Sequence, residues 1–87
     1  MLSAQTRKEK YQAYQAVFRN RAKNLRKIIE RTPGTWHSVA KQTGKSIQLL
    51  KQCAGDNPCR SIGDKLTTEL EWTLRLLPGT LSLPWNP

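Results

Sequence analysis

The stretch from Lys8 to Arg31 contains neither glycine nor proline, so nothing in it breaks a helix. Its apolar residues recur every three or four positions, so in a helix they share one side and most basic residues take the other. They are Tyr11, Tyr14, Val17, Phe18, Ala22, Leu25, Ile28 and Ile29. Thr32-Pro33-Gly34 ends the pattern. The pattern predicts either one long helix or an arm followed by a helix that begins near Phe18.

Two short helices are expected next, the first after Gly34 and the second over residues 47–54. Thr35 and Ser46 can cap their N-terminal ends, and Gly44 and Gly55 can end them. The inward face of the first helix is expected to carry Trp36, Val39 and Ala40.

A longer helix is predicted to open at Ser61, because Asp64 follows it at the spacing of a capping box. Pro78-Gly79 breaks this helix, and residues 80–83 are expected to add one more turn. Its apolar stripe is Leu66, Leu70, Trp72, Thr73, Leu74 and Leu77, and Trp72 and Trp85 are expected to anchor the core or the tail. No strand pattern is present. The sequence therefore predicts an all-α fold, a compact bundle of about five helices with a basic N-terminal helical extension.

The chain is basic, with a formal net charge of +9. Residues 1–31 hold nine basic side chains against two acidic ones, residues 32–60 hold four against one, and residues 61–87 hold two against three. The positive charge therefore belongs to the first two thirds of the chain. We therefore expect a polyanionic partner. Nucleic acid is the first candidate, and an acidic membrane surface or an acidic protein comes after it.

Length and composition exclude several other classes of protein. The 87 residues allow one small domain, or one domain with an arm. No apolar run approaches the roughly 20 residues that span a bilayer, and the first residues lack the apolar stretch of a signal peptide, so we expect a cytoplasmic protein without a membrane partner. Cys53 and Cys59 lack the spacing of a zinc site, so free thiols, no metal and no cofactor are expected. No catalytic set is evident, and we expect a protein that is not an enzyme.

The residues of the two short helices meet the packing requirements of a helix-turn-helix unit. Such a unit needs a small residue where the first helix touches the second, and Ala40 supplies it. Gly44, four residues later, opens the turn, and the apolar Leu50 and Cys53 then fasten the second helix to the core.

The stretch from Asn24 to Trp85 resembles the lambda-repressor-like helix-turn-helix family of phage and bacterial regulators, over about 60 residues. Residues 24–30, NLRKIIE, look like the first helix of that family, and residues 39–46, VAKQTGKS, look like its scaffold helix and turn. Residues 60–66, RSIGDKL, together with Leu77-Pro78-Gly79 and Leu83-Pro84-Trp85, are similar to short prophage-type members. The resemblance implies a helix-turn-helix DNA-binding domain over residues 19–87, with residues 1–18 as a basic arm or helical extension.

The resemblance also implies that the second short helix enters the major groove of double-stranded DNA, with its N-terminal residues on base edges. The candidate base contacts are Ser46, Ile47, Gln48, Lys51 and Gln52. Their chemistry agrees, since glutamine pairs with adenine, lysine donates to guanine and isoleucine touches a thymine methyl group. Gln48 is the strongest candidate, and Leu49, Leu50 and Cys53 are expected to point inward.

Phosphate contacts are expected from basic side chains and from the amides that begin the first short helix. The candidates are Arg26, Thr35, His37, Lys41, Lys45 and Arg60. Trp36, at the same helix start, is expected in the core. Arg7 and Lys8 are weaker candidates for an arm in the minor groove.

These inferences predict a sequence-specific transcriptional regulator, a repressor of phage or bacterial origin that is associated with the nucleoid. The alternatives are an RNA- or ribosome-associated basic protein and a helical protein-interaction adaptor. Because one short helix reads only a few base pairs, we expect a homodimer on an inverted repeat.

Two apolar segments are candidates for the dimer contact. One is the N-terminal stripe of Tyr11, Tyr14 and Phe18, and the other is the tail with Leu81, Leu83 and Trp85. The tail is favoured because its segment is nearly neutral, whereas the N-terminal segment brings like charges together in a symmetric interface.

Overall fold

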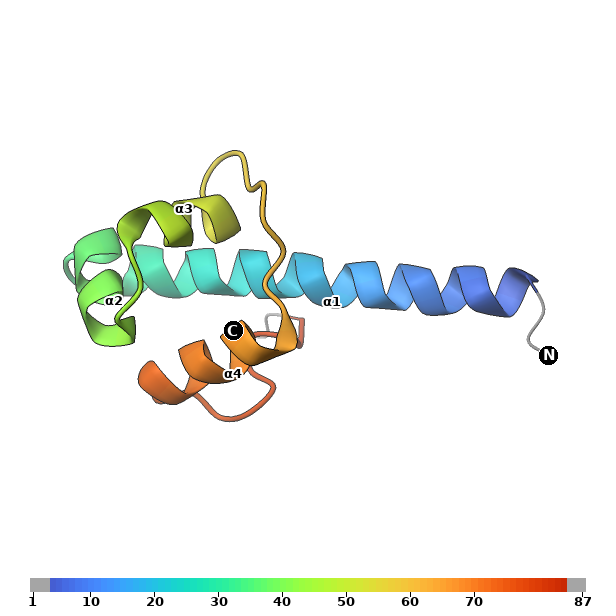
Figure 1. Ribbon diagram of the computed structural model, residues 1–87. Helices are drawn as coiled ribbons and strands as arrows, with labels where there is room; N and C mark the ends of the chain where they lie inside the picture. The colour runs from blue at the N-terminus through green and yellow to red at the C-terminus, as the bar shows by residue number, and fades with distance from the viewer. Residues whose placement is uncertain (1–3, 85–87) are drawn as a thin grey trace.

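The computed structural model describes the backbone of residues 4–84 and the side chains of residues 15–84. Within that range the chain forms four helices and no strand: α1 (Ala4–Arg31), α2 (Thr35–Thr43), α3 (Ile47–Ala54) and α4 (Asp64–Thr73). α2 and α3 pack against α1 and against each other, and α4 packs against α2 (Figure 1). The all-α prediction is confirmed, and the number of helices is one fewer than the five expected.

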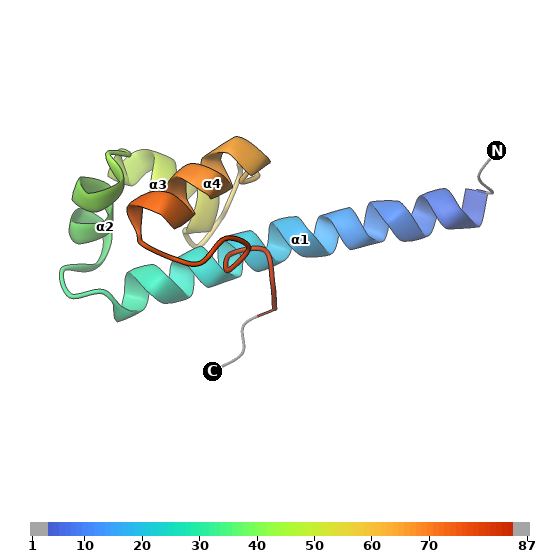
Figure 2. The same ribbon diagram turned by 90° about the horizontal axis from the view of Figure 1, so that it is seen from below.

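α1 is one continuous helix of 28 residues, so residues 4–18 extend the helix of the domain and do not form a separate arm. The N-terminal half of α1 reaches beyond the other three helices in both views (Figure 1, Figure 2). Further along, Leu25 and Ile29 of the predicted stripe are fully buried, and Phe18 is half-buried. The side chains of Tyr11 and Tyr14 lie outside the described residues.

The core lies between the C-terminal half of α1 and the three shorter helices. Trp36, Ala40 and Leu49 are half-buried and pack against it, on the inward faces that the sequence predicts. Cys53 is buried and Cys59 is exposed, both as free thiols. The buried apolar residues of the core are Leu25, Ile29, Val39, Leu50, Cys53, Ala54, Ile62, Leu70 and Leu81.

The predicted ends of α2 and α3 are correct at three of four positions. Gly44 ends α2 in the left-handed conformation (φ 72°), and Gly55 ends α3. Ser46 caps α3, since its hydroxyl accepts a hydrogen bond from the Leu49 amide at 3.1 Å. The cap predicted at Thr35 is wrong. The Thr35 amide donates to the carbonyl of Thr32 at 2.9 Å and closes a tight turn. Gly34 (φ 86°) is therefore the residue before α2, and Thr35, with a φ of 48°, is the first residue of the helix.

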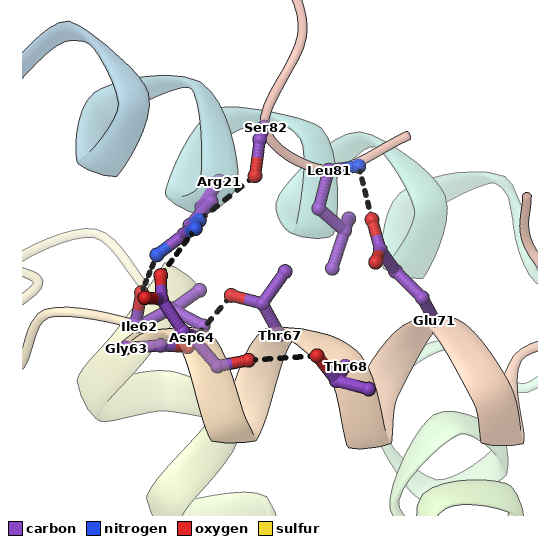
Figure 3. Close-up of polar contacts among 9 residues, drawn as sticks. All are labelled: Arg21, Ile62, Gly63, Asp64, Thr67, Thr68, Glu71, Leu81 and Ser82. Carbon is purple, nitrogen blue, oxygen red and sulfur yellow. Dashed lines mark hydrogen bonds and ion pairs between the residues drawn. The ribbon is translucent and has the colours of Figure 1, made fainter. Parts of the chain in front are cut away.

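The capping box predicted at Ser61 is also wrong, because α4 begins three residues later, at Asp64. The reason is the buried Arg21 of α1, which bonds to the residues around the start of α4 (Figure 3). Its Nη1 donates to the carbonyl of Ile62 at 2.9 Å, and its Nη2 lies 2.8 Å from the carboxylate of Asp64. Asp64 therefore fastens the start of α4 to α1, and Gly63 before it is extended.

The last turn of helix expected at residues 80–83 is a series of hydrogen-bonded turns. The backbone of Leu81 has other partners, and its side chain is fully buried. Its amide donates to the buried carboxylate of Glu71 at 3.0 Å (Figure 3), and its carbonyl accepts from Asn24 Nδ2 at 2.8 Å. Asn24 also donates to the carbonyl of Leu83 at 2.6 Å. These bonds hold the segment against α1 in a non-helical conformation.

The apolar stripe predicted for α4 is wrong at two positions. Leu70 is buried, but Trp72 is 83% exposed and Leu77 is 80% exposed. Because each helical residue turns by about 100°, Trp72 points away from the side of Leu70. Leu77 lies beyond Thr73, where α4 ends. Neither side chain therefore belongs to the core, and Trp85 lies outside the described residues.

Candidate nucleic-acid interface

α2 and α3 are joined by a turn of three residues, Gly44 to Ser46. The Gly44 amide donates to the carbonyl of Ala40 at 2.9 Å and closes the end of α2. The Thr43 hydroxyl accepts from the Lys45 amide at 3.3 Å on the other side of that glycine. These contacts fix the direction in which α3 leaves the turn.

α3 is divided into an inner and an outer side. Leu50, Cys53 and Ala54 are buried against the rest of the domain. Ser46, Gln48 and Lys51 are exposed, and Ile47 and Gln52 are half-exposed. The five candidate base contacts therefore share the solvent side of α3 and its N-terminal end. Polar donors and acceptors on a short exposed helix have the chemistry to hydrogen-bond base edges.

The outer side of α3 continues onto the loop that follows it. A surface hollow of this region is lined by Ile47, Gln48, Lys51, Gln52, Asn57 and Cys59. The loop folds back because the amides of Cys59 and Arg60 both donate to the carbonyl of Gln52, at 2.9 and 3.1 Å. Sequence reasoning missed Asn57 and Cys59, although the turn residues after Gly55 indicate that the chain reverses there.

Lys51 is positioned by an aromatic ring of α2. Its Nζ lies 5.9 Å from the centroid of Trp36, within the range of a cation–π contact. Trp36 is half-buried against the core, so the ring has a fixed position. The contact orients the Lys51 ammonium group on the outer side of α3.

Arg26 is held by two carboxylates at the surface. Its Nε donates to Glu30 at 2.9 Å, and its Nη2 donates to Asp56 in the loop after α3 at 2.6 Å. The hydrogen bonds that Arg26 donates to Glu30 and Asp56 raise the pKa of Arg26. This pairing joins α1 to the loop beside the candidate base contacts.

Lys45 is held in the same way by α4. Its Nζ lies 2.6 Å from the Glu69 carboxylate, and that hydrogen bond holds the pKa of Glu69 below its ordinary value. A second contact joins the same two regions, since Gln42 Nε2 donates to the carbonyl of Thr73 at 3.1 Å. The C-terminal part of α4 therefore lies beside the turn that precedes α3.

The remaining phosphate candidates lie in two places. Thr35, His37 and Lys41 are exposed along α2. Arg60 is exposed in the loop before α4 and lines a different hollow, together with Phe18 and Arg19 of α1. Three of these candidates therefore lie on α2, and Arg60 lies in the loop between α3 and α4.

Leu81, one of the tail residues favoured for the dimer contact, is buried. Leu83 is 62% exposed, and Trp85 lies outside the described residues. A fully buried side chain is unavailable to a second chain, so the predicted set does not form one surface.

Among the residues that the structure describes, no three side chains of the metal-binding types His, Cys, Asp or Glu cluster in a way that fits a metal ion. None of the described helices combines the length and the apolar character that crossing a membrane requires.

Comparison of the chain with known proteins finds no matching family model, and no curated protein or solved structure gives a significant match.

Proposed function

We propose that this chain is a sequence-specific double-stranded DNA-binding protein that regulates transcription, as a repressor of phage or bacterial origin at the nucleoid. In this proposal α2, the turn and α3 form a helix-turn-helix, and α3 lies in the major groove. The chain acts as a binding module and not as an enzyme.

The observation that carries the proposal is the composition of the outer side of α3. Leu50 and Cys53 are buried on the inner side of α3, while Ser46, Gln48 and Lys51 are exposed on its outer side and at its N-terminal end. A solvated helix surface needs no particular donor and acceptor pattern. An amide, an ammonium group and a hydroxyl over less than two turns match the base edges that the major groove presents.

Electrostatics supports a polyanionic partner for α1 to α3. α1 carries nine basic and two acidic residues, and α2 and α3 each add one lysine. Lys41 is exposed and can donate to a phosphate directly. Arg26 and Lys45 are paired with exposed or half-exposed carboxylates, so a phosphate can replace Asp56 or Glu69 as their partner.

A homodimer on an inverted repeat completes the proposal. α3 has eight residues and reaches only a few base pairs. Two copies related by a two-fold axis double the sequence that is read.

One observation favours a second candidate, an RNA- or ribosome-associated protein. The N-terminal half of α1 extends beyond the domain and carries Arg7, Lys8 and Lys10 (Figure 1). A basic helix of that kind can bind a structured RNA without any contribution from α3.

Selection of bound duplexes from a random DNA pool tests the proposal, with structured RNA as a parallel competitor. We expect a conserved motif of inverted half-sites, and we expect the selected duplex to outcompete the RNA. Recovery of random sequences, or preferential retention of the RNA, would contradict DNA regulation and favour the second candidate.

A further inference from the structure

The two cysteines of the chain border the same hollow at the surface. Cys53 is buried in the last turn of α3, and Cys59 is exposed in the loop that follows α3. The hollow is also lined from α1, by Phe18, Arg19 and Ala22. The fold therefore places one buried thiol and one exposed thiol beside a common space.

The backbone of the loop holds the two cysteines close together. The Cys59 amide donates to the carbonyl of Gln52 at 2.9 Å, and the Arg60 amide donates to the same carbonyl at 3.1 Å. Because that carbonyl belongs to the peptide that joins Gln52 to Cys53, the Cα atoms of the two cysteines lie within about 7 Å of each other. Disulfides join Cα atoms that are about 4.4–6.8 Å apart. The loop is therefore already folded back to about the distance that a disulfide requires.

The two thiols differ in their access to an oxidant. Cys59 is exposed, so an oxidant reaches it from solvent. Burial raises the pKa of the Cys53 thiol above its ordinary value of 9.0, Arg60 opposes this increase, and the charge of Cys59 adds to it. Cys53 therefore stays protonated and shielded, whereas the thiolate is the form that peroxides oxidise. Cys59 is the thiol that reacts first, and Cys53 is the one beside it.

We propose that Cys53 and Cys59 form a reversible oxidation site, at which a peroxide converts two free thiols into one disulfide. The Cys59 sulfur attacks one oxygen of the peroxide O–O bond and becomes a sulfenic acid, and the other oxygen leaves as water or an alcohol. The Cys53 sulfur then attacks the Cys59 sulfur, so the S–S bond forms and the sulfenic oxygen leaves as water. The thiols supply the electrons that the peroxide gains, and their two hydrogens end in these products. A thiol reductant reverses the reaction by exchange.

The oxidation site lies at the edge of the candidate nucleic-acid interface. Cys59 also borders the hollow on the outer side of α3 that Gln48 and Lys51 line. The chemistry itself requires no nucleic acid, so the proposal stands or falls independently of the proposed function. Its test uses the chain alone.

The test treats the wild-type chain, Cys53→Ala and Cys59→Ser with a small excess of hydrogen peroxide, and it measures free thiols and intact masses. We expect the wild-type monomer to lose both thiols and about 2 Da, and to regain both thiols in dithiothreitol. With dimedone present, Cys53→Ala should be trapped as the sulfenic acid of Cys59. Cys59→Ser should keep its buried thiol, because no exposed thiol remains to start the reaction.

Two results of this test would overturn the proposal. One is a wild-type chain in which Cys59 accumulates as sulfenic or sulfinic acid while Cys53 stays a free thiol. The other is a disulfide that dithiothreitol does not open in the folded chain, because such a bond would be structural and not reversible.

A melting measurement separates the effect of the fold from that of the short spacing, since two cysteines this close in sequence can also join in an unfolded chain. A disulfide that fits the fold restricts mainly the unfolded chain, so the oxidised wild type should melt at a higher temperature than the reduced one. Cys59→Ser is the control and should melt at the same temperature before and after peroxide. An oxidised wild type that melts below the reduced chain would show that the fold opposes the bond, and this would contradict the proposal.

Discussion

Gln48 is exposed on the outer side of α3, whereas Leu50 and Cys53 hold the helix from the other side. Replacing Gln48 therefore changes the surface without opening the core. We predict that Gln48→Ala loses about 1–3 kcal/mol of discrimination at one base position while its melting temperature is unchanged. The measurement is the affinity for single-base variants of the selected duplex.

Lys41→Ala is the matched control, because Lys41 is exposed on α2 and is proposed to contact a phosphate. It should weaken binding to all sequence variants alike. A Gln48→Ala chain that keeps the wild-type preference at every position would move the recognition surface away from α3.

Asn24 is a buried residue whose importance comes from the tail that it binds. Its Nδ2 donates to the carbonyls of Leu81 and Leu83, at 2.8 and 2.6 Å. Asn24→Ala leaves these acceptors without their donor, and we predict a loss of about 2–3 kcal/mol in the free energy of unfolding. Asn20→Ala, which removes one longer bond to the carbonyl of Ser82 at 3.2 Å, should cost less than about 1 kcal/mol. Denaturant unfolding followed by circular dichroism measures both, and equal losses would show that Asn24 does not hold the tail.

At the scale of elements, the turn between α2 and α3 depends on the conformation of Gly44. Its φ of 72° is unfavourable for any residue with a Cβ atom, although an added Cβ would meet no neighbouring atom. Gly44→Ala should therefore destabilise the domain by about 1 kcal/mol through backbone strain alone. Gly63→Ala is the control, because that glycine has an ordinary φ of −72° and equally open space. Thermal unfolding checks both chains, and a neutral Gly44→Ala would contradict a strained turn.

The ion pair that joins the turn to α4 gives a pH dependence. The hydrogen bond from Lys45 lowers the pKa of Glu69 from its ordinary value of 4.5 in the folded chain. The pair therefore stabilises the fold fully above pH 4.5, and this contribution is lost as the pH falls through the lower folded-state pKa. Glu69→Gln should remove that part of the pH dependence. Below the folded-state pKa of Glu69, the substitution should have little effect on the free energy of unfolding. Unfolding curves between neutral and acid pH measure the difference, and identical pH profiles of the two chains would refute the coupling.

The elements that the sequence predicts well are those set by local chemistry. The apolar spacing of α1, the serine cap at Ser46 and the left-handed end at Gly44 all depend on residues within a few positions of each other. The predictions that failed depend on distant partners. Asp64 pairs with Arg21, 43 residues earlier, and this removes the capping box at Ser61.

The candidate site divides in the same way. The exposure of Ser46, Gln48 and Lys51 follows from the helical period once Leu50 and Cys53 are placed inside. The pairing of Arg26 with Asp56 and of Lys45 with Glu69 joins elements at least 24 residues apart, and no local pattern announces it. The exposure of Trp72 follows from the helical period, because it lies two residues after the buried Leu70. The exposure of Leu77 was missed because an apolar stripe does not show where its helix ends.

At the scale of the whole molecule, charge is separated between two parts of the fold. α1 to α3 form a positive body with the candidate base contacts on it, and α4 is acidic. In the proposed function the positive part binds DNA. It meets the acidic α4 at the turn into α3, where Lys45 and Glu69 are paired.

The most direct test of sequence-specific DNA binding is a salt titration of binding to the selected duplex and to a shuffled duplex of the same composition. If each subunit neutralises four to seven phosphates, the log–log slope for either duplex should be about −4 to −6 per subunit. The selected duplex should bind at least about 10³-fold more tightly than the shuffled one at physiological salt. Coincident curves for the two duplexes, or affinities that do not change with salt, would contradict the account.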